Sequence, residues 1–565
     1  MMMQKYLLHF FILLLLLPAL PGNAQQDTLL MSVDTRKSKG PLNPIWAWFG
    51  YDEPNYTYMK DGKKLLTEIA ALSKVPVYVR VHSLLVTGDG TAALKWGSTN
   101  AYTEDANGNP VYSWTIIDKI FDTFIERGMK PVAQIGFMPE ALSVKPSPYR
   151  HHWQPDNKYN DIFTGWAYPP KDYKKFAALV YEWVKHSVAR YGKAEVESWY
   201  WELWNEPNIG YWKGTTEEYI KLYDYTADAV KRALPTARIG GPEVTGPNWD
   251  VAAKFLKTFL DHVVSGKNYA TGKTGAPLDV ITFHAKGAPK VIDGHVQMNM
   301  AAQLRDIDKG FEIIAAYPSL KKLPVIIGES DPEGCAACSE AFHPSNAYRN
   351  GTMYSSYTAA SFARKYDLAA ARGINLAGAV TWAFEFEDQP WFAGFRDLAT
   401  NGVDKPVLNV FRMFGLMQGD RLEVSGQTNY DYRQILDSSV RGAKRDVNAL
   451  AAGDAHSASV MVWNYHDDNI IPAQSSPVKI KVKGLPSTRV LLKHYRIDAS
   501  HSNAYEVWKK MGAPQHPDAL QTAQLERAGQ LEAITSPEWV LPRNGEIILN
   551  TDLPGQGVSL LQLTW

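Results

Sequence analysis

Several features that would point to common classes of protein are missing from this 565-residue chain. Basic and acidic residues balance at 59 each, so no excess of positive charge argues for nucleic acid as a partner. No Gly-x-Gly-x-x-Gly loop follows the first predicted strand, which disfavours a dinucleotide-binding open sheet. Beyond the N-terminus, no apolar run is long enough to span a bilayer.

Cysteine is nearly absent, since only Cys335 and Cys338 occur, in the motif Cys-Ala-Ala-Cys. In a cytosolic chain this spacing would suggest redox chemistry or half of a zinc site. No thioredoxin-like βαβ context surrounds the pair, and two further zinc ligands at a suitable spacing are missing. We therefore expect no metal site, and in an exported chain we expect a disulfide that fixes a loop.

The longest apolar run lies at the N-terminus. A basic start precedes the run Tyr6–Leu17, and small residues follow at Gly22 and Ala24. This order is typical of a secretory signal peptide over residues 1–24, and the run is too short to favour a transmembrane helix. Because no cysteine lies near the predicted signal-peptide cleavage site after Ala24, a lipid anchor is not expected. The chain is predicted to be periplasmic or secreted, with no membrane span after signal cleavage.

Strand-like and helix-like patterns alternate over residues 44–419. The helical stretches, such as 176–188 and 219–234, carry apolar residues at three- and four-residue steps. Eight strand–helix alternations predict an α/β fold, a (β/α)8 TIM barrel. The strands are predicted at Ile45–Phe49, Val77–His82, Pro131–Phe137, Trp199–Asn205, Ile239–Pro242, Val280–His284, Val325–Glu329 and Ala377–Trp382.

The pattern changes over residues 420–565, where short runs such as Val478–Lys483 alternate apolar and polar residues. This periodicity predicts an accessory β-sandwich without chemistry of its own, to which Leu29–Val33 of the N-terminal segment 25–43 adds a strand. Within the barrel, residues 138–170 are too many for an ordinary βα loop, so we expect a cover over the pocket. Its adjacent histidines, 151 and 152, are expected to pack or hydrogen-bond rather than bind metal.

Two predicted strands end in the same way. Trp199–Asn208 reads Trp-Tyr-Trp-Glu-Leu-Trp-Asn-Glu-Pro-Asn, and Leu323–Pro332 reads Leu-Pro-Val-Ile-Ile-Gly-Glu-Ser-Asp-Pro. Glu206 and Glu329 thus follow barrel strands four and seven, at the end where barrel enzymes carry their active sites. A single glutamate there is usually a helix cap or a surface ion pair, but two at matching positions favour function. Paired carboxylates hydrolyse glycosidic bonds: one protonates the leaving oxygen and the other attacks the anomeric carbon.

The first of these runs resembles the signature of glycoside hydrolase family 39, the β-xylosidases and α-L-iduronidases, although Trp201 stands where the family usually has Phe. Shorter motifs match in the same order: Tyr-Val-Arg-Val-His at 78–82, Phe-His-Ala-Lys-Gly-Ala at 283–288, Gly-Glu-Ser-Asp-Pro at 328–332 and Lys-Pro-Val-Leu at 405–408. The resemblance covers nearly the whole chain after the signal peptide. It implies a barrel with a β-sandwich, retaining chemistry and no metal or organic cofactor.

The resemblance also implies roles for individual residues. Glu206 resembles the family's acid/base and Glu329 its nucleophile. Arg80 resembles an arginine near the nucleophile, whose fixed charge would keep Glu329 ionised. The other implied substrate-binding residues are Asn205, which would bond the sugar 2-hydroxyl, His82 and His284 in the pocket wall, and Trp382 as an aromatic platform. For His82, His284 and Trp382, simple core packing is an equal alternative.

Lys286 is the residue that best distinguishes the two possible sugar specificities. The iduronidase branch has His-x-Lys-Gly-Ala at this place, whereas the xylosidase branch tends to carry Tyr two residues after the histidine. A lysine in a pocket needs an anionic partner, which could be a sugar carboxylate, a sulfate, or Glu387 or Asp388 of the chain itself. Arg396 is a candidate for a second carboxylate-binding residue. Asn208 and the sequence Pro-Pro-Lys-Asp-Tyr at 169–173 look more like the xylosidase side.

We therefore expect a retaining exo-glycosidase that removes a terminal sugar from an oligosaccharide or polysaccharide, most readily a β-xyloside. An α-L-iduronidase-like enzyme for an acidic or sulfated sugar is the alternative. A non-catalytic carbohydrate-binding barrel would have lost one of the two glutamates, and both are present. The sequence does not separate hydrolysis from transglycosylation, and it gives no oligomeric state.

Overall fold

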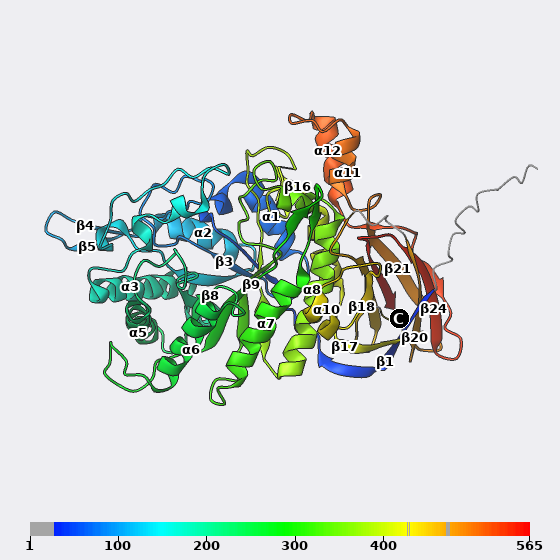
Figure 1. Cartoon of the computed structure of the whole chain (residues 1–565), viewed down its shortest axis with the longest axis horizontal. Coiled ribbons are helices and arrows are strands. Elements are labelled where there is room, and N and C mark those ends of the chain that lie inside the picture. The colour runs from blue at the N-terminus through cyan, green and yellow to red at the C-terminus, as the bar shows by residue number, and fades with distance from the viewer. Residues whose placement is uncertain (1–27, 427, 429, 470–474) are drawn as a thin grey trace, which may run out of the picture.

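The computed structural model describes residues 28–426, 428, 430–469 and 475–565, and it has two packed domains (Figure 1). The predicted signal peptide, residues 1–24, lies outside the described residues, so it stays a prediction. Within the described ranges, no helix is both long enough and apolar enough to cross a bilayer.

The larger domain is the predicted parallel barrel. In the described part of the chain, its strands follow the order β13-β12-β9-β8-β7-β6-β3-β2-β14, and β13 and β14 are two halves of the last barrel strand. Because β13 pairs with β12 and β14 pairs with β2, the sheet closes on itself. The predicted (β/α)8 fold is confirmed. The barrel strands are β2 (Trp48–Tyr51), β3 (Tyr78–Val81), β6 (Lys130–Ile135), β7 (Tyr200–Leu203), β8 (Arg238–Val244), β9 (Val280–Lys286), β12 (Val325–Asp331), β13 (Leu376–Ala379) and β14 (Thr381–Trp382).

A helix follows each barrel strand and buries its apolar face against the sheet. Trp183 of α3, for example, packs edge-on against Trp201 of β7, with ring centroids 5.1 Å apart. Both indoles are fully buried, so this pair seals the junction between helix and strand. The helices are α1 (Lys60–Ala70), α2 (Thr115–Ile125), α3 (Tyr173–Tyr191), α5 (Thr216–Ala233), α6 (Asp250–Ser265), α7 (Met300–Ala315), α8 (Thr352–Arg372) and α9 (Pro406–Leu416).

The inward side of the barrel is charged below the catalytic rim. Side chains alternate along a strand, so Glu202 points inward when its neighbour Trp201 points out to α3. Glu202 pairs with Arg80 of β3, and Glu243 of β8 lies 3.8 Å from the same guanidinium. All three are buried, so the barrel interior is a network of ion pairs rather than an aliphatic core.

The second domain is a sheet that folds over its own core. Within the described residues it has ten strands, and strands near both ends of the sheet, such as β21 and β24, contribute to one apolar cluster. The sheet thus forms the two layers of a sandwich around this cluster. The layers are joined by continuous strand pairing, whereas a simple sandwich would have two separate sheets. The strands are β1 (Leu29–Pro41), β17 (Asp420–Gly426), β18 (Asp446–Gly453), β19 (Ser457–Tyr465), β20 (Ser476–Lys483), β21 (Val490–Ile497), β22 (Glu532–Ala533), β23 (Glu538–Val540), β24 (Glu546–Leu553) and β25 (Val558–Thr564).

Strand β1 lies inside this sheet, antiparallel to β17 and parallel to β20. The chain therefore begins its described part in the second domain, crosses to build the barrel, and then returns (Figure 1). Helices α11 (Ala504–Lys510) and α12 (Ala519–Gly529) project from the sheet and pack against the loop after β14, where Trp508 contacts Phe392.

Helix α8 joins the two domains through a buried ion pair. Arg364 donates from Nη2 to both carboxylate oxygens of Asp446, at 2.8 and 3.0 Å, and Trp463 donates to the same carboxylate at 2.9 Å. Nearby, Ser356 donates to Gln556 at 2.6 Å. Since these groups are buried, the contact fixes the sheet domain against the barrel.

Replacing Arg364 by Ala should destabilise the protein, because it leaves the buried charge of Asp446 without its cation. We expect a loss of about 3 to 5 kcal/mol, measured by urea unfolding. Arg190→Ala removes a half-exposed ion pair with Asp122 and should cost about 1 kcal/mol or less. Equal losses for the two variants would contradict a structural role for the Arg364 contact.

Candidate active site

The backbone at the end of β7 and β8 is held in an unusual conformation. Trp204, Glu206 and Glu243 have φ angles of 68°, 42° and 54°, in the left-handed region that side chains rarely adopt. The amide of Glu206 donates to the carbonyl of Glu243 at 2.8 Å, which ties the two strand ends together. Such strained positions cluster at functional sites, where surrounding contacts maintain them.

The two predicted catalytic glutamates converge on one histidine. Glu206 Oε1 lies 2.9 Å from His284 Nδ1, and Glu329 Oε2 lies 3.8 Å from the same nitrogen. Each glutamate has an oxygen within 4.8 Å of the other. Side chains that are far apart in sequence, from β12 and the loop after β7, therefore face one point at the carboxyl end of the barrel.

Positive charge surrounds Glu329. Lys286 Nζ lies 2.7 Å from Oε2, while Arg80 Nη1 and His82 Nε2 lie 3.4 and 3.6 Å from Oε1. Burial alone would raise the pKa of Glu329, but the positive charges around it, with that of Lys286 the largest and those of His284 and Arg80 beside it, outweigh burial and lower the pKa to about 2. Glu329 is consequently ionised at neutral pH.

Lys286 finds its anionic partners on the adjacent strand, so the sequence-based suggestion of Glu387 or Asp388 was wrong. Its Nζ lies 2.7 Å from Glu329 and 2.7 Å from Asp331 Oδ2. The register explains this, because β9 and β12 place Asp331 directly opposite Lys286. Glu387 instead accepts a hydrogen bond at 2.9 Å from the backbone of Asp61 in α1, away from these contacts.

His284 carries a positive charge between the carboxylates. Burial lowers its pKa, but the negative charge of Glu329 and the contacts with Glu206 and Glu243 raise it to about 9. Its second nitrogen, Nε2, lies 2.8 Å from Glu243 Oε2. An imidazolium in this position bonds Glu206 through one nitrogen and is held by Glu243 through the other.

Asn205 is oriented by Arg80, whose Nη2 donates to its Oδ1 at 3.1 Å. The amide nitrogen of Asn205 is buried and has no hydrogen-bond partner among the described residues. That nitrogen is a donor that lacks an acceptor, and a sugar hydroxyl could supply the acceptor oxygen.

The two glutamates beside Arg80 differ in protonation. Burial raises the pKa of Glu202 well above its usual range, whereas the charge of Arg80 lowers the pKa of Glu243 despite burial.

Trp382 and His82 lie under the site rather than in an open wall. The Trp382 ring is 1% exposed, with the His82 ring 4.4 Å and the Arg80 guanidinium 4.9 Å from its centroid. His82 Nδ1 lies 2.9 Å from Asp52 Oδ1, and burial lowers the pKa of the imidazole. Trp382 thus supports Arg80 and His82 from below.

Four charged residues near the site were missed by the sequence analysis: Asp52, Lys95, Glu243 and Asp331. Asp331 could have been found, because it follows Glu329 by two residues and so faces the same side of the strand. Glu243 comes directly after the predicted strand Ile239–Pro242, which stops two residues before β8 does. Lys95 pairs with Asp52 from an irregular loop, which has no periodicity to reveal it.

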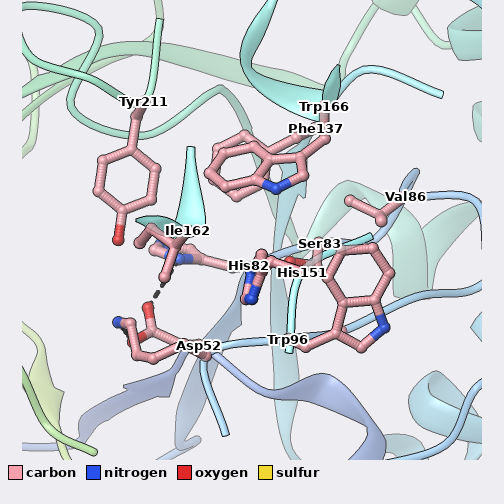
Figure 2. Close-up of a pocket in the computed structure, with 12 residues that line it drawn as sticks. Asp52, His82, Ser83, Val86, Trp96, Phe137, His151, Ile162, Trp166 and Tyr211 are labelled. Atoms are coloured by element: carbon pink, nitrogen blue, oxygen red, sulfur yellow. Dashed lines mark hydrogen bonds and ion pairs between the residues drawn. The ribbon is translucent and has the colours of Figure 1, made fainter. Parts of the chain in front are cut away.

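One cavity is lined by Glu206, and a second is lined by His82, which lies beside Glu329. The larger, about 860 Å³, is lined by Glu206, Lys286 and the Cys335–Cys338 disulfide, whose predicted formation is confirmed. The smaller, about 20 Å³, holds roughly one water molecule, and His82, Asp52 and Lys95 are among the residues that line it. In Figure 2 the aromatic side chains of Tyr211, Phe137 and Trp166 lie on one side of it, with Asp52 and Trp96 on the other.

The insert 138–170 lines both cavities. Tyr159 reaches the larger one, and its hydroxyl lies 2.9 Å from that of Tyr211, which lines the smaller. His151 is buried and accepts a hydrogen bond from the Trp153 amide at 3.3 Å, whereas His152 is exposed. The adjacent histidines therefore point to different surroundings and do not form one site.

A TIM barrel with two converging carboxylates at its carboxyl rim is the architecture of a glycoside hydrolase. Residues 29–542 match the family described as Glycosyl hydrolases family 39, and the chain belongs to this family of glycosidases. It is 27% identical over 444 residues to a β-xylosidase of Caldicellulosiruptor saccharolyticus, covering 77% of this chain and 80% of the relative. It is 24% identical over 582 residues to the α-L-iduronidase of Mus musculus, and the match covers 96% of this chain and 82% of the relative.

Solved structures share the whole architecture. A monomeric β-xylosidase from Caulobacter crescentus CB15 superposes with a TM-score of 0.72 at 22% identity, covering 95% of this chain and 99% of that one. A family 39 enzyme from Xanthomonas axonopodis pv. citri superposes with a TM-score of 0.74 at 20% identity, and the match covers 97% of this chain and 99% of that one. These likenesses support the barrel with its second sheet domain.

Replacing Lys286 by Met should move the acid limb of the kcat/KM–pH profile to higher pH. The reason is that Lys286 is the largest favourable charge on Glu329, so its loss raises the pKa of that carboxyl. The profile of kcat/KM reports ionisations of the free enzyme. Lys290→Met, at an exposed lysine of the following hairpin, is the matched control and should leave the limb in place. An unshifted limb in the Lys286 variant would contradict the role given to its charge.

Proposed function

We propose that the protein is a retaining exo-glycosidase, with Glu329 as nucleophile and Glu206 as acid/base. The observation that carries the proposal is the carboxylate separation, since an oxygen of each lies within 4.8 Å of the other. Retaining enzymes hold their carboxyl groups about 5 to 5.5 Å apart, whereas inverting enzymes leave about 6.5 to 9.5 Å for a water molecule.

The surroundings of the two glutamates suit these roles. Glu329 is ionised and buried, so it attacks the anomeric carbon from a desolvated position. Glu206 is partly exposed to the larger cavity, and His284 binds its Oε1, which leaves Oε2 to carry the proton for the leaving oxygen. Once the sugar is bonded to Glu329, that side chain is neutral, and Glu206 activates a water molecule as the general base.

The shape of the site supports removal of a terminal sugar. On the Glu206 side the site opens into about 860 Å³. On the His82 side it meets the Asp52–Lys95 ion pair, where the cavity has a volume of only about 20 Å³. A chain of sugars can extend in the first direction but not in the second, as exo-action requires.

The charges favour a neutral sugar such as a β-xyloside. Lys286 already contacts two carboxylates, so no unpaired cation of this side chain awaits a sugar carboxylate. Arg396 is fully buried and binds Glu333 and the carbonyls of Trp382 and Gly334, which removes it as a second carboxylate ligand. A β-xylosidase is also among the relatives.

An acidic sugar is the second candidate. Lys286 is 16% exposed and lines the larger cavity, and α-L-iduronidases are similar to this chain over most of its length. A substrate carboxylate would have to displace Glu329 or Asp331 from the ammonium. A non-catalytic binding barrel is disfavoured, because a protein that only binds sugar has no need of an ionised Glu329 beside a proton donor such as Glu206.

We also propose export to the periplasm or the medium. The Cys335–Cys338 bond supports it, because disulfides persist in oxidising compartments.

The two glutamates should respond differently to leaving groups. Glu329→Ala should abolish turnover of every substrate, at least 10³-fold, because it removes the nucleophile. Glu206→Ala should lose far more activity on alkyl or sugar leaving groups than on nitrophenyl groups, which need no proton to depart. Initial rates and circular dichroism measure activity and fold, and Glu126→Ala, at an exposed helix end, should behave as wild type. Normal turnover by Glu329→Ala would remove it from the nucleophile role.

The sugar and the stereochemistry can be read from one set of aryl glycosides. We expect hydrolysis of nitrophenyl β-D-xyloside at a kcat/KM well above that of the corresponding α-L-iduronide, because the pocket cations are already paired. Proton NMR of the xylose first released from the β-D-xyloside should show the β-anomer before mutarotation, as retention requires. Faster hydrolysis of the iduronide would favour the acidic-sugar alternative, and an initial α-anomer would overturn retention.

A further inference from the structure

The larger cavity lies on the side of the site where the leaving group departs. Glu206 lines it, whereas Glu329 does not. In a retaining glycosidase the acid stands beside the leaving oxygen, so the space next to it receives whatever is cleaved off. Its volume of about 860 Å³ is near the top of the roughly 300 to 1,000 Å³ range of ligand pockets. That is more room than a single leaving-group ring requires.

One wall of this cavity ends in an exposed tryptophan. The segment 245–249 is held near Glu206 by Asn208, which bonds the hydroxyl of Thr245 at 2.6 Å and its amide at 3.0 Å. Asp306 accepts from the amide of Asn248 at 3.2 Å and fixes the next turn. Trp249 follows directly, lines the cavity and is 50% exposed. A large ring left half open on a rigid segment is a stacking surface.

A second part of the cavity lining is fixed by covalent and ionic contacts. It carries the Cys335–Cys338 disulfide, which lines the cavity. The buried guanidinium of Arg349 donates to the carbonyls of Cys335 and Cys338 at 2.7 and 2.8 Å. Arg396 holds the start of the same loop through the carbonyl of Gly334 at 3.0 Å. Since both walls are held in place, the cavity is largely pre-formed and needs little ordering to bind.

We propose that this cavity binds the leaving-group sugars of an oligosaccharide, with the indole of Trp249 stacked on a pyranose ring. The C–H face of a pyranose is apolar and packs on an aromatic ring, while its hydroxyls bond the polar groups around it. The inference rests on the proposed function, because that function puts the acid Glu206 at the mouth of the cavity. It adds that Trp249 makes the enzyme prefer a sugar to a small alcohol as the leaving group.

The test compares substrates that share a terminal sugar and differ in the leaving group. Purified enzyme is assayed for kcat/KM on nitrophenyl β-D-xyloside and on β-1,4-xylotriose. Trp249→Ala should lower kcat/KM for xylotriose at least about fivefold relative to the aryl xyloside. Trp249→Phe should recover most of that loss, because it keeps an aromatic face. Trp539→Ala, at an exposed tryptophan of the second domain, is the matched control and should change neither rate.

The outcomes separate this inference from the proposed function. A wild-type enzyme that cleaves the aryl xyloside through Glu206 and Glu329, with equal losses on both substrates in Trp249→Ala, would overturn the inference and leave the function standing. Failure of wild type to cleave xylotriose would overturn it also. Loss of xylotriose selectivity in Trp249→Ala alone, with recovery in Trp249→Phe, supports the stacking role.

Discussion

The active site depends on one buried carboxylate that is kept ionised. Glu329 has lost most of its contact with water, and burial by itself would neutralise it. Lys286 at 2.7 Å, with His284 and Arg80 further away, reverses that tendency. The same cations are balanced by Asp331, which contacts Lys286, and by Glu243, which lies beside Arg80 and His284. Glu329 and its counterions therefore share one low-dielectric environment, where electrostatic contacts are strong.

The closed barrel is what brings these charges together. Lys286 and Asp331 meet because β9 and β12 are neighbours in register, which is a local consequence of strand pairing. Arg80 reaches Glu329 from β3, across the barrel interior, because the sheet curves back on itself. Beneath them, the Arg80–Glu202 pair occupies space that aliphatic side chains fill in many barrels. Stability and catalysis thus depend on the same buried network.

The network extends from Glu329 to the outer wall of the site. Asp331 contacts Lys286 at 2.7 Å and Arg396 at 3.5 Å, and Arg396 in turn holds the loop of the disulfide. The second domain contributes at a distance: its helices α11 and α12 support the loop after β14, and α8 is anchored to it by Arg364. The loop after β14 and helix α8 are therefore both held by the second domain.

Hydrophobic periodicity and strand-end chemistry were sufficient to predict the barrel, the second β domain and the positions of Glu206 and Glu329, and the lone cysteine pair with the predicted export signal was sufficient to predict the disulfide. These are local signals, since each strand or helix shows its own period and each glutamate follows its own apolar run. The partners of Lys286, the pairing of Lys95 with Asp52 and the buried position of Trp382 were decided by the tertiary structure. Contacts between residues far apart in sequence depend on strand register, barrel closure and loop paths, and none of these leaves a periodic trace in the chain.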